Sequence, residues 1–140
     1  MEQKNVFPRT HISLFVSDTS ETVQFYDKFF NEGAAKVKED YAKYELDAPA
    51  LTISFIQNPK KVNAEVGHFG IQVKTKEELN DKLNLARGQK LVQLEEAETA
   101  CCYAIQDKFW VNDPDGYEWE VYHFLGDLEQ KEEKQAAACC

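Results

Sequence analysis

His-Ile-Ser-Leu-Phe-Val at residues 11–16 and His-Phe-Gly-Ile-Gln-Val at residues 68–73 are two runs of the same kind. Each begins with histidine and then largely alternates apolar with polar side chains, which is the pattern of a half-buried β-strand. Similar runs in the two halves of a 140-residue chain indicate an internal repeat of one structural unit. The sequence therefore predicts two related modules, each opened by a histidine-led strand.

The segments around these runs predict the same order of elements in both halves. In the first half we expect a helix that starts within residues 17–22 and ends before Gly33, and strands at 10–16, 34–38, 41–46 and 51–56. In the second half we expect a helix at 76–87, an acidic loop at 95–100, apolar segments at 101–106 and 109–111, and strands at 68–73, near 90–94 and at 117–124. The predicted fold class is α+β, with two tandem βαβββ modules at about 9–57 and 66–125.

The composition fits a globular protein without a nucleic-acid or membrane partner. The chain is 43% hydrophobic and carries a formal net charge of −9, which argues against binding to phosphate-rich surfaces. No segment has the length of a membrane span or the apolar core of a signal peptide, so we expect a cytosolic protein. We expect one domain over residues 1–126, as a monomer or a homodimer, and a polar, flexible tail over residues 127–140.

Three side chains are candidate metal ligands: His11, His68 and Glu120. Strand alternation puts both histidines on the face opposite the apolar one, and Glu120 lies in the last strand. We expect the three to converge in one cleft between the modules. Two histidines and one carboxylate leave coordination positions open, as in non-haem Fe(II) oxygenases. Each of the three could instead be an ordinary polar residue on a half-exposed strand.

The first module offers no fourth ligand. When the last strands of the two modules are aligned on their preceding turns, Glu120 pairs with Ser54. A symmetric four-ligand site would need a carboxylate at that position. Three ligands leave room on the metal for substrate, water or dioxygen, which argues against a glyoxalase-like isomerase with a closed ligand set. His123 is predicted to lie on the opposite strand face and is not included.

The adjacent pair Cys101 and Cys102 is the second chemical signal. Two thiolates favour a soft centre such as As(III) over hard cations, provided that the backbone there is loop-like. The pair could equally be two small half-buried hydrophobic residues. Tyr103 and Lys108 flank the thiols as candidate substrate contacts, although aromatic residues near them fit a strand core and the lysine fits a solvated strand edge. The pair at residues 139–140 is interpreted as part of an unstructured end.

The tandem plan over about residues 9–125 resembles the vicinal oxygen chelate superfamily, which includes glyoxalase I, extradiol dioxygenases and the fosfomycin and bleomycin resistance proteins. More narrowly, the chain resembles the carbon–arsenic lyases and the related cadmium-induced proteins. The most specific block is Thr-Ala-Cys-Cys-Tyr-Ala at 99–104, followed by Asp-Lys-Phe-Trp-Val at 107–111 and Asp-Pro-Asp-Gly at 113–116. The resemblance implies a half-barrel cleft built by the two modules.

The resemblance also implies an Fe(II)- and O2-dependent enzyme that cleaves the C–As bond of trivalent organoarsenicals, such as methylarsonous acid or reduced aromatic arsenicals, to arsenite. The implied metal ligands are His11, His68 and Glu120, and the implied arsenic-binding thiols are Cys101 and Cys102. In several relatives the first-strand ligand is Gln, so His11 leaves the metal preference open. Two other functions stay open: a thiol-based metalloid or cadmium binder without catalysis, and another enzyme of the superfamily, such as an extradiol-type dioxygenase.

Overall fold

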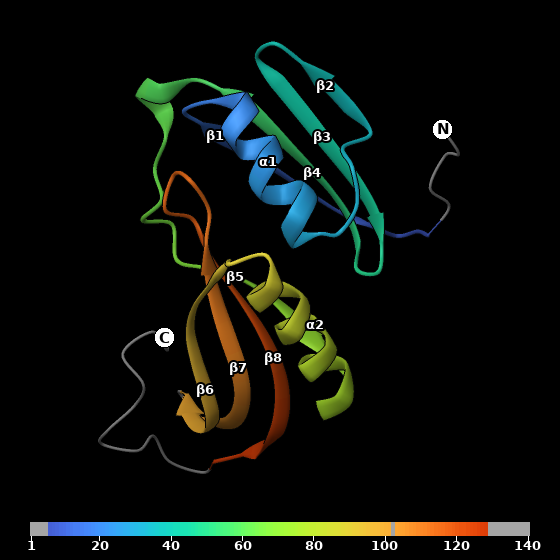
Figure 1. The fold of residues 1–140 in the computed structure, drawn as a ribbon, viewed down its shortest axis with the longest axis vertical. Helices are drawn as coiled ribbons and strands as arrows, with labels where there is room; N and C mark the ends of the chain where they lie inside the picture. The colour runs from blue at the N-terminus through green and yellow to red at the C-terminus, as the bar shows by residue number, and fades with distance from the viewer. Residues whose placement is uncertain (1–5, 102, 129–140) are drawn as a thin grey trace. The chain divides into compact units, whose positions relative to one another are not determined.

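The computed structural model describes residues 6–101 and 103–128. The chain forms two compact units: unit 1 comprises Met1–Val66 and Asp113–Tyr117, and unit 2 comprises Gly67–Asn112 and Glu118–Cys140. Each unit contains one four-stranded mixed sheet and one α-helix (Figure 1). The predicted α+β class with two βαβββ modules is confirmed.

Unit 1 follows the predicted order of strand, helix and three strands. Its elements are β1 (Thr10–Val16), α1 (Thr19–Phe29), β2 (Lys36–Lys38), β3 (Tyr41–Asp47) and β4 (Ala50–Gln57), followed by the short 3-10 helix η1 (Pro59–Lys61). The strand order in the sheet is β1-β4-β3-β2, and β1 runs parallel to β4. The strand expected at 34–38 is shorter than predicted and begins at Lys36.

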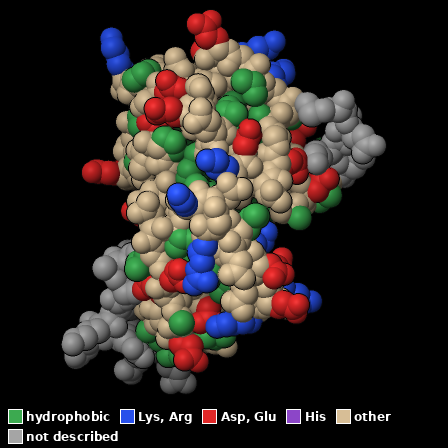
Figure 2. All heavy atoms as spheres, in the orientation of Figure 1, with side chains coloured by type: hydrophobic (Ala, Val, Ile, Leu, Met, Phe, Trp, Pro, Cys, Tyr) green, Lys and Arg blue, Asp and Glu red, His purple; other side chains and the backbone are tan. Residues whose placement is uncertain are grey.

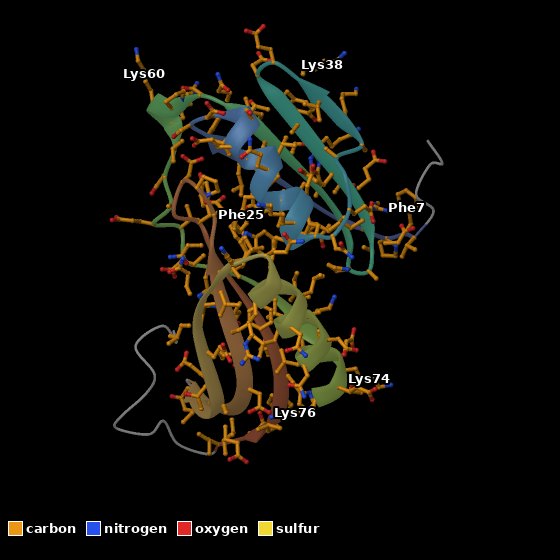
Figure 3. All side chains as sticks on the ribbon, in the orientation of Figure 1. Phe7, Phe25, Lys38, Lys60, Lys74 and Lys76 are labelled. Atoms are coloured by element: carbon orange, nitrogen blue, oxygen red, sulfur yellow. The ribbon has the colours of Figure 1, made fainter. Side chains whose placement is uncertain are left out.

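The helix of unit 1 covers the apolar face of its sheet. It begins after Asp18, whose carboxylate accepts a hydrogen bond from the backbone N–H of Glu21 at 3.0 Å and so caps the first turn. Phe25, which is labelled in Figure 3, packs edge to face on Tyr26 at 4.9 Å, and the Tyr26 ring stacks on Phe55 of β4 at 4.3 Å. Each such ring stabilises the fold by about 1.5–3 kcal/mol through burial. The apolar side of β1 thus faces the helix, and the His11 side does not.

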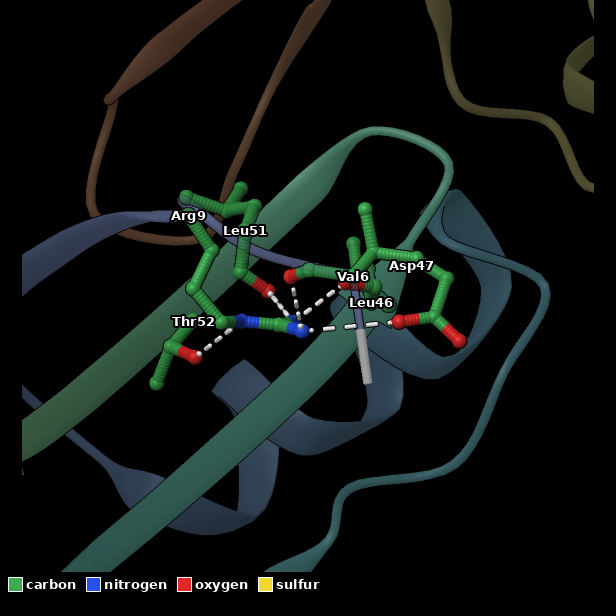
Figure 4. A network of polar contacts seen from close by, with 6 residues as sticks. All are labelled: Val6, Arg9, Leu46, Asp47, Leu51 and Thr52. Atoms are coloured by element: carbon green, nitrogen blue, oxygen red, sulfur yellow. Dashed lines mark hydrogen bonds and ion pairs between the residues drawn. The ribbon is translucent and has the colours of Figure 1, made fainter. Parts of the chain in front are cut away.

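Arg9 fastens the start of β1 to the hairpin of β3 and β4 (Figure 4). Its guanidinium is largely buried, with 9% of the side chain exposed. It donates to the carbonyl oxygens of Val6, Leu46 and Leu51, the hydroxyl of Thr52 and the carboxylate of Asp47. A planar guanidinium with five donors suits such a convergent set of acceptors. This network holds the backbone at Arg9 in place and so positions the start of β1, which carries His11.

Unit 2 repeats the plan. Its elements are β5 (Phe69–Val73), α2 (Lys76–Gly88), β6 (Val92–Cys101), β7 (Ala104–Asn112) and β8 (Glu118–Asp127). The strand order is β5-β8-β7-β6, and β5 runs parallel to β8. The Thr75 hydroxyl caps α2 by accepting from the Glu78 N–H, and Lys76 in its first turn donates to Asp107 of β7 at 2.7 Å (Figure 3).

The prediction of an acidic loop at residues 95–100 is wrong, because this segment belongs to strand β6. The strand pairs with β7 and contains an irregularity between Glu96 and Thr99, where Glu98 has a positive φ of 45°. Two acidic side chains find partners there: Glu95 binds Arg87 of α2, and Glu96 accepts from the indole of Trp110. These bonds offset the low strand propensity of glutamate.

Two strand boundaries also differ from expectation. β8 runs to Asp127 rather than ending at residue 124, and His68 lies one residue before β5 rather than inside it. Acidic and basic side chains are interspersed over the face in view in Figure 2. In the described part of the chain, neither helix is long and apolar enough to span a membrane.

Candidate functional site

The sheet face of unit 2 that carries Glu120 is defined by cross-strand register. Glu120 of β8 lies between Gly70 of β5 and Trp110 of β7, and Tyr122 lies opposite Lys108. Residues directly opposite each other in neighbouring strands point to the same face. Phe109, Trp119 and Val121 occupy the other face and are buried. His123, which pairs with Asp107, is on that other face as predicted.

The Glu120 carboxylate is held between a histidine and a lysine. Its Oε1 lies 3.5 Å from Nε2 of His68, and its Oε2 accepts a hydrogen bond from Nζ of Lys108 at 2.8 Å. The exposed fraction is 10% for the Glu120 side chain, 0% for Lys108 and 31% for His68. A buried carboxylate needs such a partner, because an unpaired buried charge is strongly destabilising. The histidine is therefore the part of this group that solvent reaches.

Lys108 is not a solvated strand-edge lysine, and that alternative is wrong. It lies on β7, an interior strand of the sheet, with its ammonium 5.4 Å from the ring centroid of Trp110 and 5.8 Å from that of Tyr122. Aromatic rings at these distances stabilise a cation. Burial raises the pKa of the Tyr122 phenol, and the nearby Glu120 carboxylate raises it further, so Tyr122 stays neutral.

Two neighbours shape the space around His68 and Glu120. The His68 ring meets the Trp110 ring edge to face at 5.0 Å, and Trp110 is fixed in turn by its indole N–H, which donates to Glu96 at 3.0 Å. A Cβ on Gly70 would lie 3.1 Å from both Cγ and Oε1 of Glu120. The absence of a side chain at Gly70 therefore makes room for the carboxylate.

Unit 1 has the corresponding group in neutral form. His11 is exposed, and its Nε2 lies 3.4 Å from Oγ of the buried Ser54. The Ser54 hydroxyl is also 3.0 Å from the phenol oxygen of Tyr41. Ser54 pairs with Ser13 of β1 as Glu120 pairs with Gly70 of β5, so the predicted equivalence of Ser54 and Glu120 is confirmed.

The residues of unit 2 fit two ligands of one metal ion. Metal bonds to imidazole and carboxylate are about 2.0–2.2 Å long, so donors roughly 3–4 Å apart can share an ion. The pair His68 Nε2 and Glu120 Oε1, at 3.5 Å, meets that condition. Over residues 6–101 and 103–128, no three His, Cys, Asp or Glu side chains form a group that could hold a metal. His11 belongs to unit 1, and its convergence with the other two stays a prediction.

The thiol part of the predicted site lies at the end of β6. Cys101 is the last residue of that strand, and its backbone pairs with Ala104, while Cys102 and residues 139–140 lie outside the described residues. Tyr103 is 54% exposed and is not a core residue, whereas Phe109 and Trp110 are buried in the sheet. The roles of Tyr103 and the thiols in substrate binding stay predictions.

Comparison with known proteins gives the family. The model of the glyoxalase/bleomycin resistance protein/dioxygenase superfamily matches residues 9–121. The chain belongs to this superfamily. It is 40% identical over 130 residues to the trivalent organoarsenical cleaving enzyme of Bacillus sp. (strain MD1), covering 92% of this chain and 81% of that enzyme. It is 31% identical to the cadmium-induced protein CadI of Mycobacterium bovis, covering 94% of this chain and 92% of that protein.

Solved structures share the fold at lower identity. The lactoylglutathione lyase of Agrobacterium tumefaciens matches with a TM-score of 0.63 at 16% identity, covering 86% of this chain and 96% of that one. Such a likeness supports the fold and not the reaction. The resemblance inferred from the sequence is thus confirmed for the superfamily and for its two narrower groups of relatives.

Proposed function

We propose that this chain cleaves the C–As bond of trivalent organoarsenicals and releases arsenite, in a reaction that needs Fe(II) and O2. The observation that carries the proposal is the pair of His68 and Glu120, combined with a serine and not a carboxylate at the equivalent place in unit 1. A ligand set of His11, His68 and Glu120 would leave positions open on the metal. The name of the Bacillus relative at 40% identity supports the substrate class.

Each predicted residue has a separate task in this proposal. His11, His68 and Glu120 would hold the iron, which when bound supplies activation of dioxygen. Cys101 and Cys102 would hold the trivalent arsenic as thiolates, because soft sulfur ligands suit that centre. Methylarsonous acid and reduced aromatic arsenicals are the expected substrates, with Tyr103 beside them. Lys108 was predicted as a second substrate contact, and because its side chain is fully buried it would act on them through its bond to Glu120. A reducing cytoplasm would keep the thiols available.

Anaerobic loading of the full chain with Fe(II), followed by oxygen and methylarsonous acid, is expected to release arsenite, measured by chromatography with arsenic detection. The variants Cys101→Ser and Cys102→Ser should lose arsenical binding and keep the wild-type iron content, because they lie outside the ligand set. Fully metallated protein that releases no arsenite would refute the proposal. Loss of iron in either cysteine variant would show that the thiols are metal ligands.

A second candidate is a protein that sequesters cadmium or a metalloid without catalysis. The 31% identity to a cadmium-induced protein favours it. Stoichiometric cadmium binding that depends on Cys101 and Cys102, without oxygen consumption in the presence of an organoarsenical, would support this candidate over the enzyme. Turnover of a catechol would instead point to an extradiol-type dioxygenase.

A further inference from the structure

The two carboxylate oxygens of Glu120 have different surroundings. Oε1 lies 3.5 Å from Nε2 of His68, which is also in the predicted ligand set, whereas Oε2 accepts a hydrogen bond from Nζ of Lys108 at 2.8 Å. The Lys108 side chain is fully buried, so no solvent competes for its ammonium. A charge-assisted bond in such a place is short and strong.

We propose that Lys108 is a positioning residue that holds Oε2 and leaves Glu120 able to bind a metal ion through Oε1 alone. The inference rests on the proposed metal site. A carboxylate that binds through both oxygens takes two coordination positions, whereas one oxygen takes a single position. Lys108 therefore keeps one more position open for the reactants, and its effect on substrate is exerted through Glu120.

Packing keeps both partners in place. The Lys108 ammonium lies near the rings of Trp110 and Tyr122. If its bond to Oε2 broke, the ammonium would be a buried and unpaired charge, which is strongly destabilising. On the other side of Glu120, the Gly70 backbone lies close enough that an added Cβ would be 3.1 Å from Cγ and Oε1. The carboxylate is thus bounded by β5 on one side and by the lysine of β7 on the other.

Unit 1 shows that a donor at this strand position is part of the repeat. Tyr41 pairs with Ile56 as Lys108 pairs with Tyr122, and the Tyr41 phenol contacts Ser54 as the Lys108 ammonium contacts Glu120. A phenol matches a neutral hydroxyl, and an ammonium matches a carboxylate. The charge of Lys108 is therefore matched to the one carboxylate ligand in the predicted set.

Co(II) binding to the full chain tests the inference, because the visible spectrum of Co(II) reports its coordination number. Lys108→Met should still bind Co(II), with a changed spectrum, and should lose about tenfold or more in arsenite release when loaded with Fe(II). Lys108→Arg, which keeps a cationic donor, should keep the wild-type spectrum. Lys76→Met is the matched control, because it breaks a similar lysine–carboxylate pair of unit 2 on the other sheet face. An unchanged spectrum in Lys108→Met would overturn the inference.

A crystal structure of the Co(II)-loaded wild type makes the test independent of how the variants fold. Glu120 bound through Oε1 alone, with Oε2 on Lys108, is the expected result, and binding through both oxygens would overturn the inference. Wild-type protein that binds no Co(II) would overturn both this inference and the proposed function. One-oxygen binding in a protein that releases no arsenite would overturn only the proposed function.

Discussion

In unit 1 the side chain beside the first histidine is a serine hydroxyl held by a phenol, whereas in unit 2 the same backbone position carries a carboxylate held by an ammonium. The strand order is the same in both units, and so is the register around this position, where Ser13 pairs with Ser54 and Gly70 with Glu120. The repeat therefore determines which strand positions lie side by side. Three differences between the units determine what those positions can bind: Ser13 against Gly70, Tyr41 against Lys108, and Ser54 against Glu120. At this position unit 2 carries the carboxylate charge that the proposed metal ligand needs, and unit 1 carries a neutral hydroxyl.

Those three substitutions depend on one another. A carboxylate at Glu120 is longer than the Ser54 hydroxyl and needs the space that Gly70 leaves where unit 1 has Ser13. It also needs a buried cation, because an unpaired buried carboxylate costs several kcal/mol. A serine needs neither. The difference shows that a carboxylate at this position depends on its neighbours, and that those neighbours are part of the candidate site.

The largest expected effect separates the two units at this position. Glu120→Gln should lower the affinity for Fe(II) or Co(II) by more than the roughly 10–100-fold that outer-shell changes cause, because it removes a charged ligand. Ser54→Ala should cost at most about tenfold, because Ser54 is outside the predicted ligand set and contacts only His11 of that set, besides Tyr41. Calorimetric titration with Co(II) measures both. Equal losses would mean that the two units contribute alike to the metal.

Gly70→Ala should have the next largest effect. The new Cβ would crowd Cγ and Oε1 of Glu120 at 3.1 Å and the Tyr122 ring at 3.4 Å, so Glu120 must shift by a few tenths of an ångström. We expect about a tenfold loss of Co(II) affinity and a fall of about 1–3 kcal/mol in the free energy of unfolding.

Ser13→Ala is the matched control for that variant, because this position already carries a Cβ beside Ser54. Its Co(II) affinity and its urea midpoint should stay near those of the wild type. A loss as large as that of Gly70→Ala would show that the strand pairing, and not the space beside Glu120, is what the glycine protects.

The fold could be predicted from the sequence because its signals are local. Alternation in the histidine-led strands, the polar run at residues 17–22 where the first helix starts, and the turns between strands each act over a few residues. The equivalence of Ser54 and Glu120 followed from counting back to those turns. The prediction of a loop at residues 95–100 was wrong because Glu95 and Glu96 bind Arg87 and Trp110, which come close only in the folded chain.

The surroundings of the site were missed for a similar reason. Gly70 and Tyr41 give no chemical signal by themselves, and the charged neighbour of Lys108 in sequence is Asp107, which does not suggest that Lys108 pairs with Glu120. Their roles depend on which residues lie opposite them across strands, and that depends on register. Aligning the third strand of each module, as was done for the last strand, would have matched Tyr41 with Lys108 and exposed the exchange of a phenol for an ammonium.

A neutral pair and a charged pair also lie on the helix side of the two sheets, at positions that are not equivalent in the repeat. In unit 1, Thr19 donates to the neutral amide of Gln57, whereas in unit 2 Lys76 donates to the buried Asp107. Burial raises the pKa of Asp107, but the Lys76 ammonium and the Glu98 N–H lower it more, so the pKa lies below its ordinary value. In unit 1, burial dominates and raises the pKa of Asp113, against hydrogen bonds from Tyr26 and the backbone that lower it.

These opposite shifts predict opposite responses to acid. A lowered pKa stabilises unit 2 above the unfolded pKa of Asp107, near 4, and this contribution is lost as pH falls through the folded pKa. A raised pKa makes unit 1 bind a proton more readily when folded, so its Asp113 contribution grows as pH falls. Amide hydrogen exchange of each unit, compared between pH 7 and a pH below about 4, should therefore show protection falling further in unit 2.

The smallest expected effect comes from Lys76→Met. It should cost unit 2 about 1 kcal/mol at pH 7, because the lysine is half exposed. It should cost less at pH 3, because that pH lies below the ordinary carboxyl pKa of about 4, where the charge of Asp107 contributes less to stability. Both tryptophans of the chain, Trp110 and Trp119, lie in unit 2, so their fluorescence during urea unfolding reports on that unit. An equal loss of unfolding free energy at both pH values would mean that Lys76 acts through packing of its aliphatic chain. The contrast between a charged unit 2 and a neutral unit 1 would then hold only on the sheet face that carries Glu120.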